Sequence, residues 1–470
     1  MRKLSCRFSL AALWTGRLVM GLLVVGFASV GLSGFAYAAD WGGHKVGHTI
    51  MSVTLQGSAG EFRPLDILIW YPADPKSYKN APPSTYKPRL HGVTLPAPWD
   101  ALSWEFAAER ARENPSIKTR RHGYPLIIVS HPATGELYGN SKISERLASY
   151  GYIVAAPAHN GDTQDEVRID FINDLIKKQG GSTFLPCLDG LGGTCTDVVR
   201  KSMQDRALDV KAVIDNISSR FGKHVDVDRI GFVGASRGSP TGLSLAGGSD
   251  ILMIPRDERV DALFLLTAGG AANPLMNQAA VTIPTVQVSG TKDRNLSVSR
   301  TTFDAISSSS KAYVVITNAW HRGLSADSYC EQMQAIGPIA QSNPETAILD
   351  LHSLKNLVLS PDSGTTLDHC PYEFFVEPVD IRPVVFAQTG VQVTPENVPT
   401  SIEREVVTVM VSALARAFFD DVLRGKDNFG EYLIGEFQYK YSENLTTVEL
   451  PSWHSDHGDD DDHGDDDDDE

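Results

Sequence analysis

Gly234-Ala235-Ser236-Arg237-Gly238 places a serine between two glycines at the junction of two predicted elements. The apolar residues 229–233 before it predict a buried strand, and residues 241–246 after it predict a helix. A strand, Gly-x-Ser-x-Gly and a helix form a nucleophile elbow, in which the serine occupies a sharp, strained turn. The helix directs its N-terminal N–H groups toward developing negative charge. Because a motif as short as Gly-x-Ser-x-Gly occurs often by chance, the prediction depends on the strand before it and the helix after it.

Strands and helices alternate outward from this stretch. Predicted strands occupy residues 46–56, 65–72, 126–131, 152–157, 229–233, 260–268, 283–290 and, as the last one, 312–318. Predicted helices occupy residues 143–150, 198–217, 241–246, 298–306 and 403–424. Insertions interrupt the pattern at about 73–122, with a helical patch at 104–112, and at 160–196 and 322–400. Such alternation predicts an α/β fold, a mostly parallel sheet covered by helices on both faces, in a single domain over residues 40–450.

The first 38 residues predict a secretory signal peptide. Arg2, Lys3 and Arg7 supply positive charge, residues 18–30 are apolar, and Ala36-Tyr37-Ala38 is a small-x-small cleavage site. An uncleaved membrane anchor is the alternative, and no other apolar segment is long enough to span a bilayer. We therefore expect an exported protein, periplasmic or secreted, with no transmembrane segment in the mature chain.

Removal of this leader takes away Cys6 and leaves Cys187, Cys195, Cys330 and Cys370. An even number of cysteines in an oxidising compartment predicts two disulfides, which three pairings would satisfy. We favour Cys187–Cys195, which closes a short Gly-rich loop, and Cys330–Cys370, which pins the third insertion. Zinc binding is the rival interpretation, but no Cys-x-x-Cys spacing favours it.

The acidic charge is concentrated at the C-terminal end. The formal net charge is −16, and residues 456–470 alone contain ten Asp and one Glu. Without this tail and the basic leader the net charge is near −9, which argues against a nucleic-acid partner. Residues 454–470 are predicted to be a disordered acidic tail. Its carboxylates, with His457 and His463, suit weak divalent-cation binding, and a solubilising role is the simpler interpretation.

Two polar residues farther along the chain, Asp293 and His321, complete a catalytic triad with Ser236 in the predicted topology. A serine hydroxyl needs a base to take its proton, and an imidazole base needs a carboxylate to fix its tautomer. Asp293 follows the predicted strand 283–290, and His321 follows the predicted strand 312–318. This order of serine, acid and histidine is the hydrolase order. Since parallel strands end at one edge of a sheet, we expect Ser236, Asp293 and His321 to converge there.

Each of these residues has a simpler interpretation. Ser236 could be a tight-turn serine, Asp293 could cap the following helix, and His321 could be a surface histidine. His352 and His369 compete with His321 as the base, but no predicted strand precedes either of them.

Two backbone N–H groups are needed to bind the negative oxygen that ester attack creates. One is expected from Arg237, the residue after the serine. The other is expected from His131-Pro132-Ala133-Thr134-Gly135, after the predicted strand 126–131. Pro132 has no N–H, so Ala133 is the first choice and Thr134 the second. An ordinary strand-to-helix turn is the alternative.

At this point the chain resembles the α/β-hydrolase superfamily, and within it the platelet-activating factor acetylhydrolase and dienelactone-hydrolase-like esterase group. The resemblance covers about residues 46–430, apart from the insertions. The matching pieces, besides the Ser236 motif, Asp293 and His321, are Val129-Ser130-His131, Leu147-Ala148-Ser149-Tyr150-Gly151-Tyr152, Arg206-Ala207-Leu208-Asp209-Val210 and Ala417-Phe418-Phe419-Asp420-Asp421-Val422-Leu423-Arg424-Gly425.

The resemblance implies a metal-independent, cofactor-free serine hydrolase that cleaves small-molecule or lipid carboxylic esters through an acyl-enzyme. Ser236 is then the nucleophile, His321 the acid–base residue and Asp293 its orienting carboxylate. The chain departs from the group at Pro132, where glycine is common, and at Asn318-Ala319-Trp320, where the group is glycine-rich. A serine nucleophile also distinguishes it from true dienelactone hydrolase, which uses cysteine. The rival functions are a non-catalytic binding protein of this fold and a metal-ion-binding surface protein acting through the acidic tail.

Overall fold

The computed structural model of the 470-residue chain describes residues 41–87, 105–160, 194–328 and 404–453, except for 134, 136, 270, 271 and 427. It also describes short pieces between residues 330 and 395. Residues Ala39–Glu470 form one compact unit. The predicted signal peptide, most of the second and third insertions and the acidic tail lie outside the described residues, so those assignments remain predictions.

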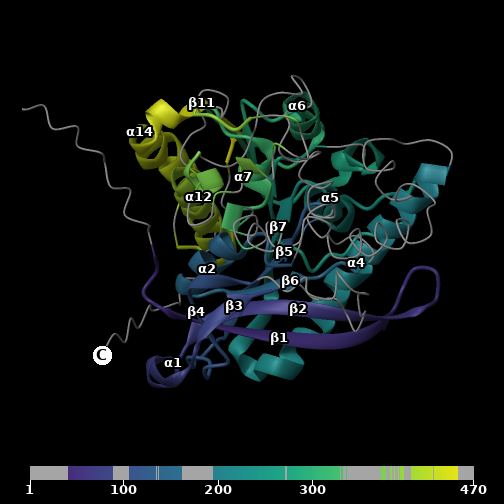
Figure 1. The fold of residues 1–470 in the computed structure, drawn as a ribbon. Coiled ribbons are helices and arrows are strands. Elements are labelled where there is room, and N and C mark those ends of the chain that lie inside the picture. Colours follow the sequence, from purple (N-terminus) through teal and green to yellow (C-terminus); the bar gives the residue numbers. More distant parts are fainter. Residues whose placement is uncertain are drawn as a thin grey trace, which may run out of the picture. The chain divides into compact units, whose positions relative to one another are not determined.

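An eleven-stranded sheet forms the centre of this unit, in the order β11-β10-β9-β8-β7-β5-β6-β2-β1-β4-β3 (Figure 1). The neighbours from β6 to β10 are parallel, whereas β1, β2, β3 and β11 form antiparallel pairs. The predicted mostly parallel sheet is confirmed. The strands are β1 (Lys45–Gln56), β2 (Phe62–Ala73), β3 (Pro83–Tyr86), β4 (Phe106–Glu113), β5 (Tyr124–Ser130), β6 (Ile153–Pro157), β7 (Val225–Ala235), β8 (Ala262–Leu266), β9 (Thr285–Gly290), β10 (Lys311–Ile316) and β11 (Leu445–Ser452).

Helices cover both faces of the sheet, as β7 illustrates. Successive side chains of a strand point to opposite faces. A Cβ on Gly231 would stand 2.5 Å from the ring of Phe419 on α12 (Arg404–Arg424). The ring of the next residue, Phe232, lies 2.7 Å from where a Cβ on Gly242 of α5 (Gly238–Gly247) would stand. Figure 1 shows α2 (Ser141–Ser149) beside α12, and α4 (Thr194–Phe221) near α5 on the other face.

One assignment from the sequence is wrong, and the strand β11 was not predicted. The patch at residues 104–112, predicted to be helical, contains the strand β4. Its backbone N–H groups at Glu109, Arg110 and Ala111 all donate to the carboxylate of Glu145 on α2, at 2.7 to 3.1 Å. A tertiary acceptor thus replaces the carbonyl oxygens that a helix would offer. The strand at 312–318 is the last one that the sequence indicates, and in the structure β11 follows it in the chain and pairs with β10 at the edge of the sheet.

Short helices follow three of the strands. Short helices α1 (Pro75–Asn80) and α6 (Leu296–Ala305) follow β2 and β9, and α7 (His321–Ser325) follows β10. Cys330 is disulfide-bonded, and its predicted partner Cys370 lies outside the described residues. Cys187 and the side chain of Cys195 lie outside them too, so the pairing remains a prediction. No described helix is both long and apolar enough to cross a bilayer.

Candidate active site

Ser236 occupies a strained turn directly after β7. Its φ is +51°, in the left-handed region that side-chain-bearing residues rarely adopt. A Cβ on Gly234 would lie 2.5 Å from the carbonyl oxygen of Gly238, and a Cβ on Gly238 would lie 2.0 Å from that of Ser130. Both flanking positions therefore require glycine. The Ser236 N–H donates to the carbonyl of Leu266 at the end of β8 (2.9 Å), which anchors the turn to the sheet.

The register of the parallel strands brings four loops to one edge of the sheet. Ser130 at the end of β5 pairs with Gly234, and Leu266 at the end of β8 pairs with Ala235. Farther along the sheet, Gly290 pairs with Ile316, so β9 and β10 end together. The residues after β5, β7, β9 and β10 include the loop with Ala133 and the three predicted triad residues. Their convergence thus follows from strand register.

Backbone bonds tie the loop after β9 to the loop after β10. The Lys292 N–H donates to the carbonyl of Ala319 (3.1 Å), and the Asn318 N–H donates to Thr291 Oγ1 (2.8 Å). Asn318 adopts a φ of +57°, which turns the chain back toward β9. These contacts hold Asp293, at the end of one loop, against His321, at the end of the other.

The structure brings the three predicted triad side chains together. His321 Nδ1 lies 2.9 Å from Asp293 Oδ1, and His321 Nε2 lies 2.9 Å from Ser236 Oγ. The Asp293 side chain is fully buried, whereas the imidazole is 16% exposed and so borders solvent. Oδ1 of Asp293 also accepts the N–H of Asn295 (2.8 Å), which limits rotation of the carboxylate.

The simpler interpretations of these residues fit the geometry less well. Asn295, not Asp293, is the N-cap residue of α6. His321 is held between two polar side chains and is not a free surface histidine. His352 and His369, the competing bases, lie outside the described residues.

The two predicted oxyanion donors lie on loops that flank the serine turn. Arg237 is the N-cap residue of α5, with φ −61° and ψ −22°, so its N–H belongs to the N-terminal turn of that helix. Ala133 is half-buried in the loop after β5, and Thr134 lies outside the described residues. Their assignment as donors remains a prediction, since it concerns a bound substrate.

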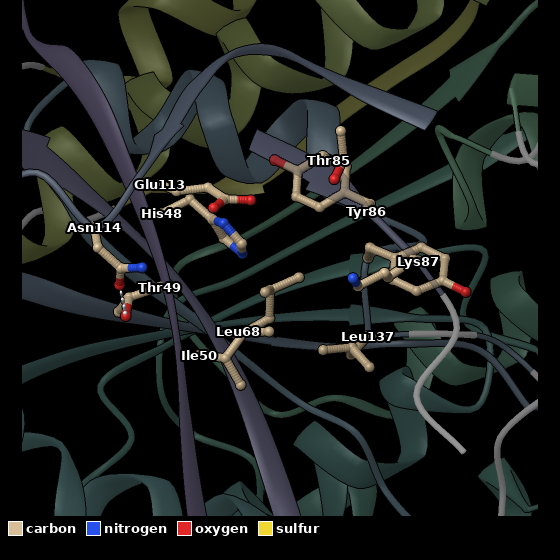
Figure 2. A pocket seen from close by; sticks show the side chains of 11 residues that line it. His48, Thr49, Ile50, Leu68, Thr85, Tyr86, Lys87, Glu113, Asn114 and Leu137 are labelled. Atoms are coloured by element: carbon tan, nitrogen blue, oxygen red, sulfur yellow. Dashed lines mark hydrogen bonds between the residues drawn. The ribbon is translucent and has the colours of Figure 1, made fainter. Parts of the chain in front are cut away.

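A separate pocket of about 240 Å³ lies between β1, β2, β3 and the segment after the Ala133 loop. Figure 2 shows His48, Leu68 and Leu137 around it, and none of the triad residues lines it. Burial lowers the pKa of His48 to about 4, so its ring is neutral at pH 7. Among the described residues, no group of three or more His, Cys, Asp or Glu side chains could hold a metal ion.

Sequence reasoning gave no role to a set of buried polar side chains beneath the Ala133 loop, namely Ser130, His159, Arg206 and Asp209, although three of them lie in stretches that resemble the family. Arg206 and Asp209 are charged residues on a helix that packs against the sheet, which was the available signal. Their partners lie far away in the chain, so spacing alone could not connect them.

The chain is similar to several known proteins over part of its length. The family model of platelet-activating factor acetylhydrolase, isoform II, matches residues 102–214, which include the Ala133 loop and end before Ser236. Among solved structures, a ferulic acid esterase from Streptomyces cinnamoneus is 18% identical, with a TM-score of 0.44 over 83% of this chain and 94% of the esterase. A dienelactone hydrolase from Anabaena variabilis is 16% identical, with a TM-score of 0.33 over 63% of this chain and 95% of that enzyme.

No curated protein matches the sequence significantly. The likeness of the sequence to known proteins is therefore that of the matched segment. The structure adds the sheet with helices on both faces and the serine turn after a central strand. The chain has a mostly parallel α/β sheet with a serine turn after a central strand, and over residues 102–214 it is similar to the family model of platelet-activating factor acetylhydrolase, isoform II.

Proposed function

We propose that this protein is a serine hydrolase that cleaves carboxylic esters through an acyl-enzyme. The observation that carries the proposal is the unbroken chain from Ser236 Oγ through His321 to Asp293, with both links at 2.9 Å. Nucleophile and base within hydrogen-bond reach, with the base oriented by a third group, is the arrangement that activates a serine.

The proposed reaction uses this chain in two proton transfers. Asp293 holds the hydrogen on His321 Nδ1, which leaves Nε2 to accept the proton of Ser236 as Oγ bonds to the ester carbonyl carbon. The carbonyl electron pair moves to oxygen, and the N–H groups of Arg237 and Ala133 bind that oxyanion. His321 then protonates the leaving alkoxide as the C–O bond breaks. A water molecule, deprotonated by His321, hydrolyses the acyl-enzyme and restores the serine.

We infer a short acyl group, of the kind removed from a phospholipid-type ester, because the matched family model is that of an acetylhydrolase. We also infer export, from the predicted signal peptide. A panel of p-nitrophenyl esters of increasing chain length tests the first inference. We expect kcat/KM to be highest for acetate and propionate. A pocket for long chains would instead favour each added methylene by up to ~0.8 kcal/mol, and a rise through the longer esters would contradict the inference.

Ser236→Ala tests the mechanism directly. We expect it to lower p-nitrophenyl acetate turnover by about 10³-fold or more and to abolish labelling by a fluorophosphonate probe. Ser244→Ala is the matched control, because Ser244 is a buried serine on α5, the helix that follows the Ser236 turn, and its hydroxyl donates to the carbonyl of Thr241 (2.7 Å). Undiminished turnover by Ser236→Ala would overturn the proposal.

A further inference from the structure

A second Ser–His–Asp arrangement lies beneath the Ala133 loop and takes no part in the proposed reaction. Ser130 Oγ lies 2.9 Å from His159 Nε2, and His159 Nδ1 lies 2.9 Å from Asp209 Oδ2. Each of the three residues is at most 1% exposed. Since substrate cannot reach this serine, the arrangement is not a second nucleophilic centre, and its polar groups must serve another part of the molecule.

We call Ser130, His159 and Asp209 the buried relay, and its hydrogen bonds run in one direction, from the serine to the aspartate. Burial, with the nearby charges of Arg206 and Arg63, lowers the pKa of His159 well below its usual value, so the ring is neutral. A neutral imidazole has a single N–H, which Nδ1 donates to Asp209, and Nε2 accepts the Ser130 hydroxyl proton. Asp209 also pairs with Arg63. Burial raises the pKa of Asp209 to about 7, so above that pH it is an ionised acceptor.

At the Ser130 end of this relay, Arg206 donates hydrogen bonds to the backbone of the Ala133 loop. Its Nη1 donates to Ser130 Oγ (3.3 Å) and to the carbonyl of His131 (2.9 Å), and its Nη2 donates to the carbonyl of Pro132 (3.2 Å). The guanidinium is 1% exposed, so these bonds are shielded from water. The planar guanidinium of Arg206 thus fixes the directions of two successive carbonyl groups.

The carbonyl of Pro132 is held from three sides. Besides Arg206, it accepts the N–H of Gly135 (3.0 Å) and faces Nδ1 of His131 (2.7 Å). In a planar trans peptide, the C=O and the following N–H point in opposite directions. The direction of the Pro132 carbonyl therefore sets the direction of the Ala133 N–H, the predicted second oxyanion donor.

We propose that Arg206, itself held by the Ser130–His159–Asp209 relay, is a positioning residue that aims the Ala133 N–H at the oxyanion. This inference rests on the proposed ester hydrolysis. Arg206 touches no substrate and acts only through the Pro132–Ala133 peptide. The relay orients the Arg206 guanidinium through Ser130, so that Nη1 and Nη2 remain hydrogen-bonded to the backbone of the Ala133 loop.

The test compares an ester with its thiono analogue, p-nitrophenyl acetate with O-p-nitrophenyl thionoacetate, at pH 8.5. Donors aimed at a negative oxygen stabilise it more than the larger, softer sulfur. Arg206→Lys keeps the charge but cannot grip two carbonyls as a fork. We expect it to lower kcat for the ester by about 10- to 100-fold with KM within about twofold. Turnover of the thionoester should fall by less than about threefold.

Arg146→Lys is the matched control, because Arg146 is an equally buried arginine (1% exposed) on α2 that pairs with Glu109 and Glu405. It should leave the ester-to-thionoester ratio unchanged. Ser130→Ala, which removes the link between Arg206 and His159, is the second variant should Arg206→Lys not fold, and we expect an ester-selective loss of about three- to tenfold. Equal losses on both substrates, or no loss, would overturn the inference. If Ser236→Ala abolishes turnover while Arg206→Lys behaves as wild type, only the positioning role fails.

Discussion

Gly238 stands where the serine turn comes closest to its neighbour. A Cβ there would lie 2.0 Å from the carbonyl oxygen of Ser130 and 2.8 Å from its carbonyl carbon, and both are backbone atoms that cannot rotate away. We predict that Gly238→Ala shifts the turn, lowers the free energy of unfolding by about 1–3 kcal/mol and lowers ester turnover by more than tenfold. Urea unfolding and p-nitrophenyl acetate kinetics measure the two effects.

Gly435 provides the control for this substitution. A Cβ added there would meet no heavy atom within 4 Å outside its local backbone, and the φ of Gly435 is not positive. Gly435→Ala should therefore leave both turnover and stability near wild type. Wild-type turnover by Gly238→Ala would show that the turn does not need the close approach described above.

His48 should make the stability of the fold depend on acid. Its pKa is lowered to about 4 by burial, from 6.5 in an exposed chain. Between these values the unfolded chain binds a proton that the folded chain does not, so the free energy of unfolding falls as pH drops from 6.5 toward 4. The full contribution is about 3 kcal/mol.

His48→Gln removes this titration. We predict that, between pH 7 and pH 4, the variant loses about 2–3 kcal/mol less stability than the wild type, as measured by urea unfolding at each pH. Parallel pH profiles for the two proteins would show that the buried ring does not carry the effect.

At the scale of elements, β4 depends on one carboxylate. Glu145 accepts three successive N–H groups of this strand and the hydroxyl of Tyr86 on β3 (2.8 Å), and it is 1% exposed. Glu145→Gln would place an amide N–H₂ against backbone donors. We predict a stability loss of about 2–4 kcal/mol and faster hydrogen exchange confined to β3, β4 and α2.

The matched control is Glu258→Gln, since that carboxylate is 82% exposed. Because Glu145 lies on α2, away from the triad contacts, kcat for p-nitrophenyl acetate should change less than about threefold below the unfolding transition. Unchanged exchange in β4 would mean that pairing with β1 and β3 alone holds the strand.

The same elements explain how far sequence reasoning reached. The end of the strand before Ser236 and most of the strands before Asp293 and His321 are buried, so each could be recognised as a strand from its own residues. Local pattern was therefore sufficient to predict that Ser236, Asp293 and His321 lie close together. β4 was mistaken for a helix because its acceptor, Glu145, lies more than thirty residues away. β11 was missed because an edge strand is half-exposed, which weakens its apolar signal.

The buried relay escaped prediction for a related reason. His159 and Asp209 are 50 residues apart, and Ser130 and Arg206 are 76 apart. Each taken alone is an ordinary polar residue at the end of a strand or on a helix. Only the register of β5 and β6 with the packing of α4 brings them together, and that is a property of the assembled sheet.

At the scale of the whole molecule, β11 and Trp453 are the last part of the chain that the structure describes, and both pack against the fold. β11 covers the edge of β10, the strand that leads to His321, and the Thr317 N–H after β10 donates to the carbonyl of Asn444 (2.8 Å). Trp453 packs on Phe429 (4.7 Å between ring centroids) and donates to Asp421 Oδ2 on α12 (2.7 Å). The acidic residues 454–470 come after these contacts.

Two truncations separate the strand from the acidic tail. Removing residues 454–470 should leave ester turnover within about twofold and the thermal midpoint within about 2 °C, since the contacts that the structure describes for β11 and Trp453 remain. Removing residues 445–470 exposes the N–H and C=O groups of β10 and takes away Thr446, whose hydroxyl lies 2.8 Å from that of Thr317. We expect this second truncation to aggregate and to lose most turnover, as measured by light scattering and p-nitrophenyl acetate kinetics. If the shorter truncation alone inactivates the protein, the acidic tail takes part in the site; if the longer one stays active and monomeric, β11 does not protect the edge of the sheet.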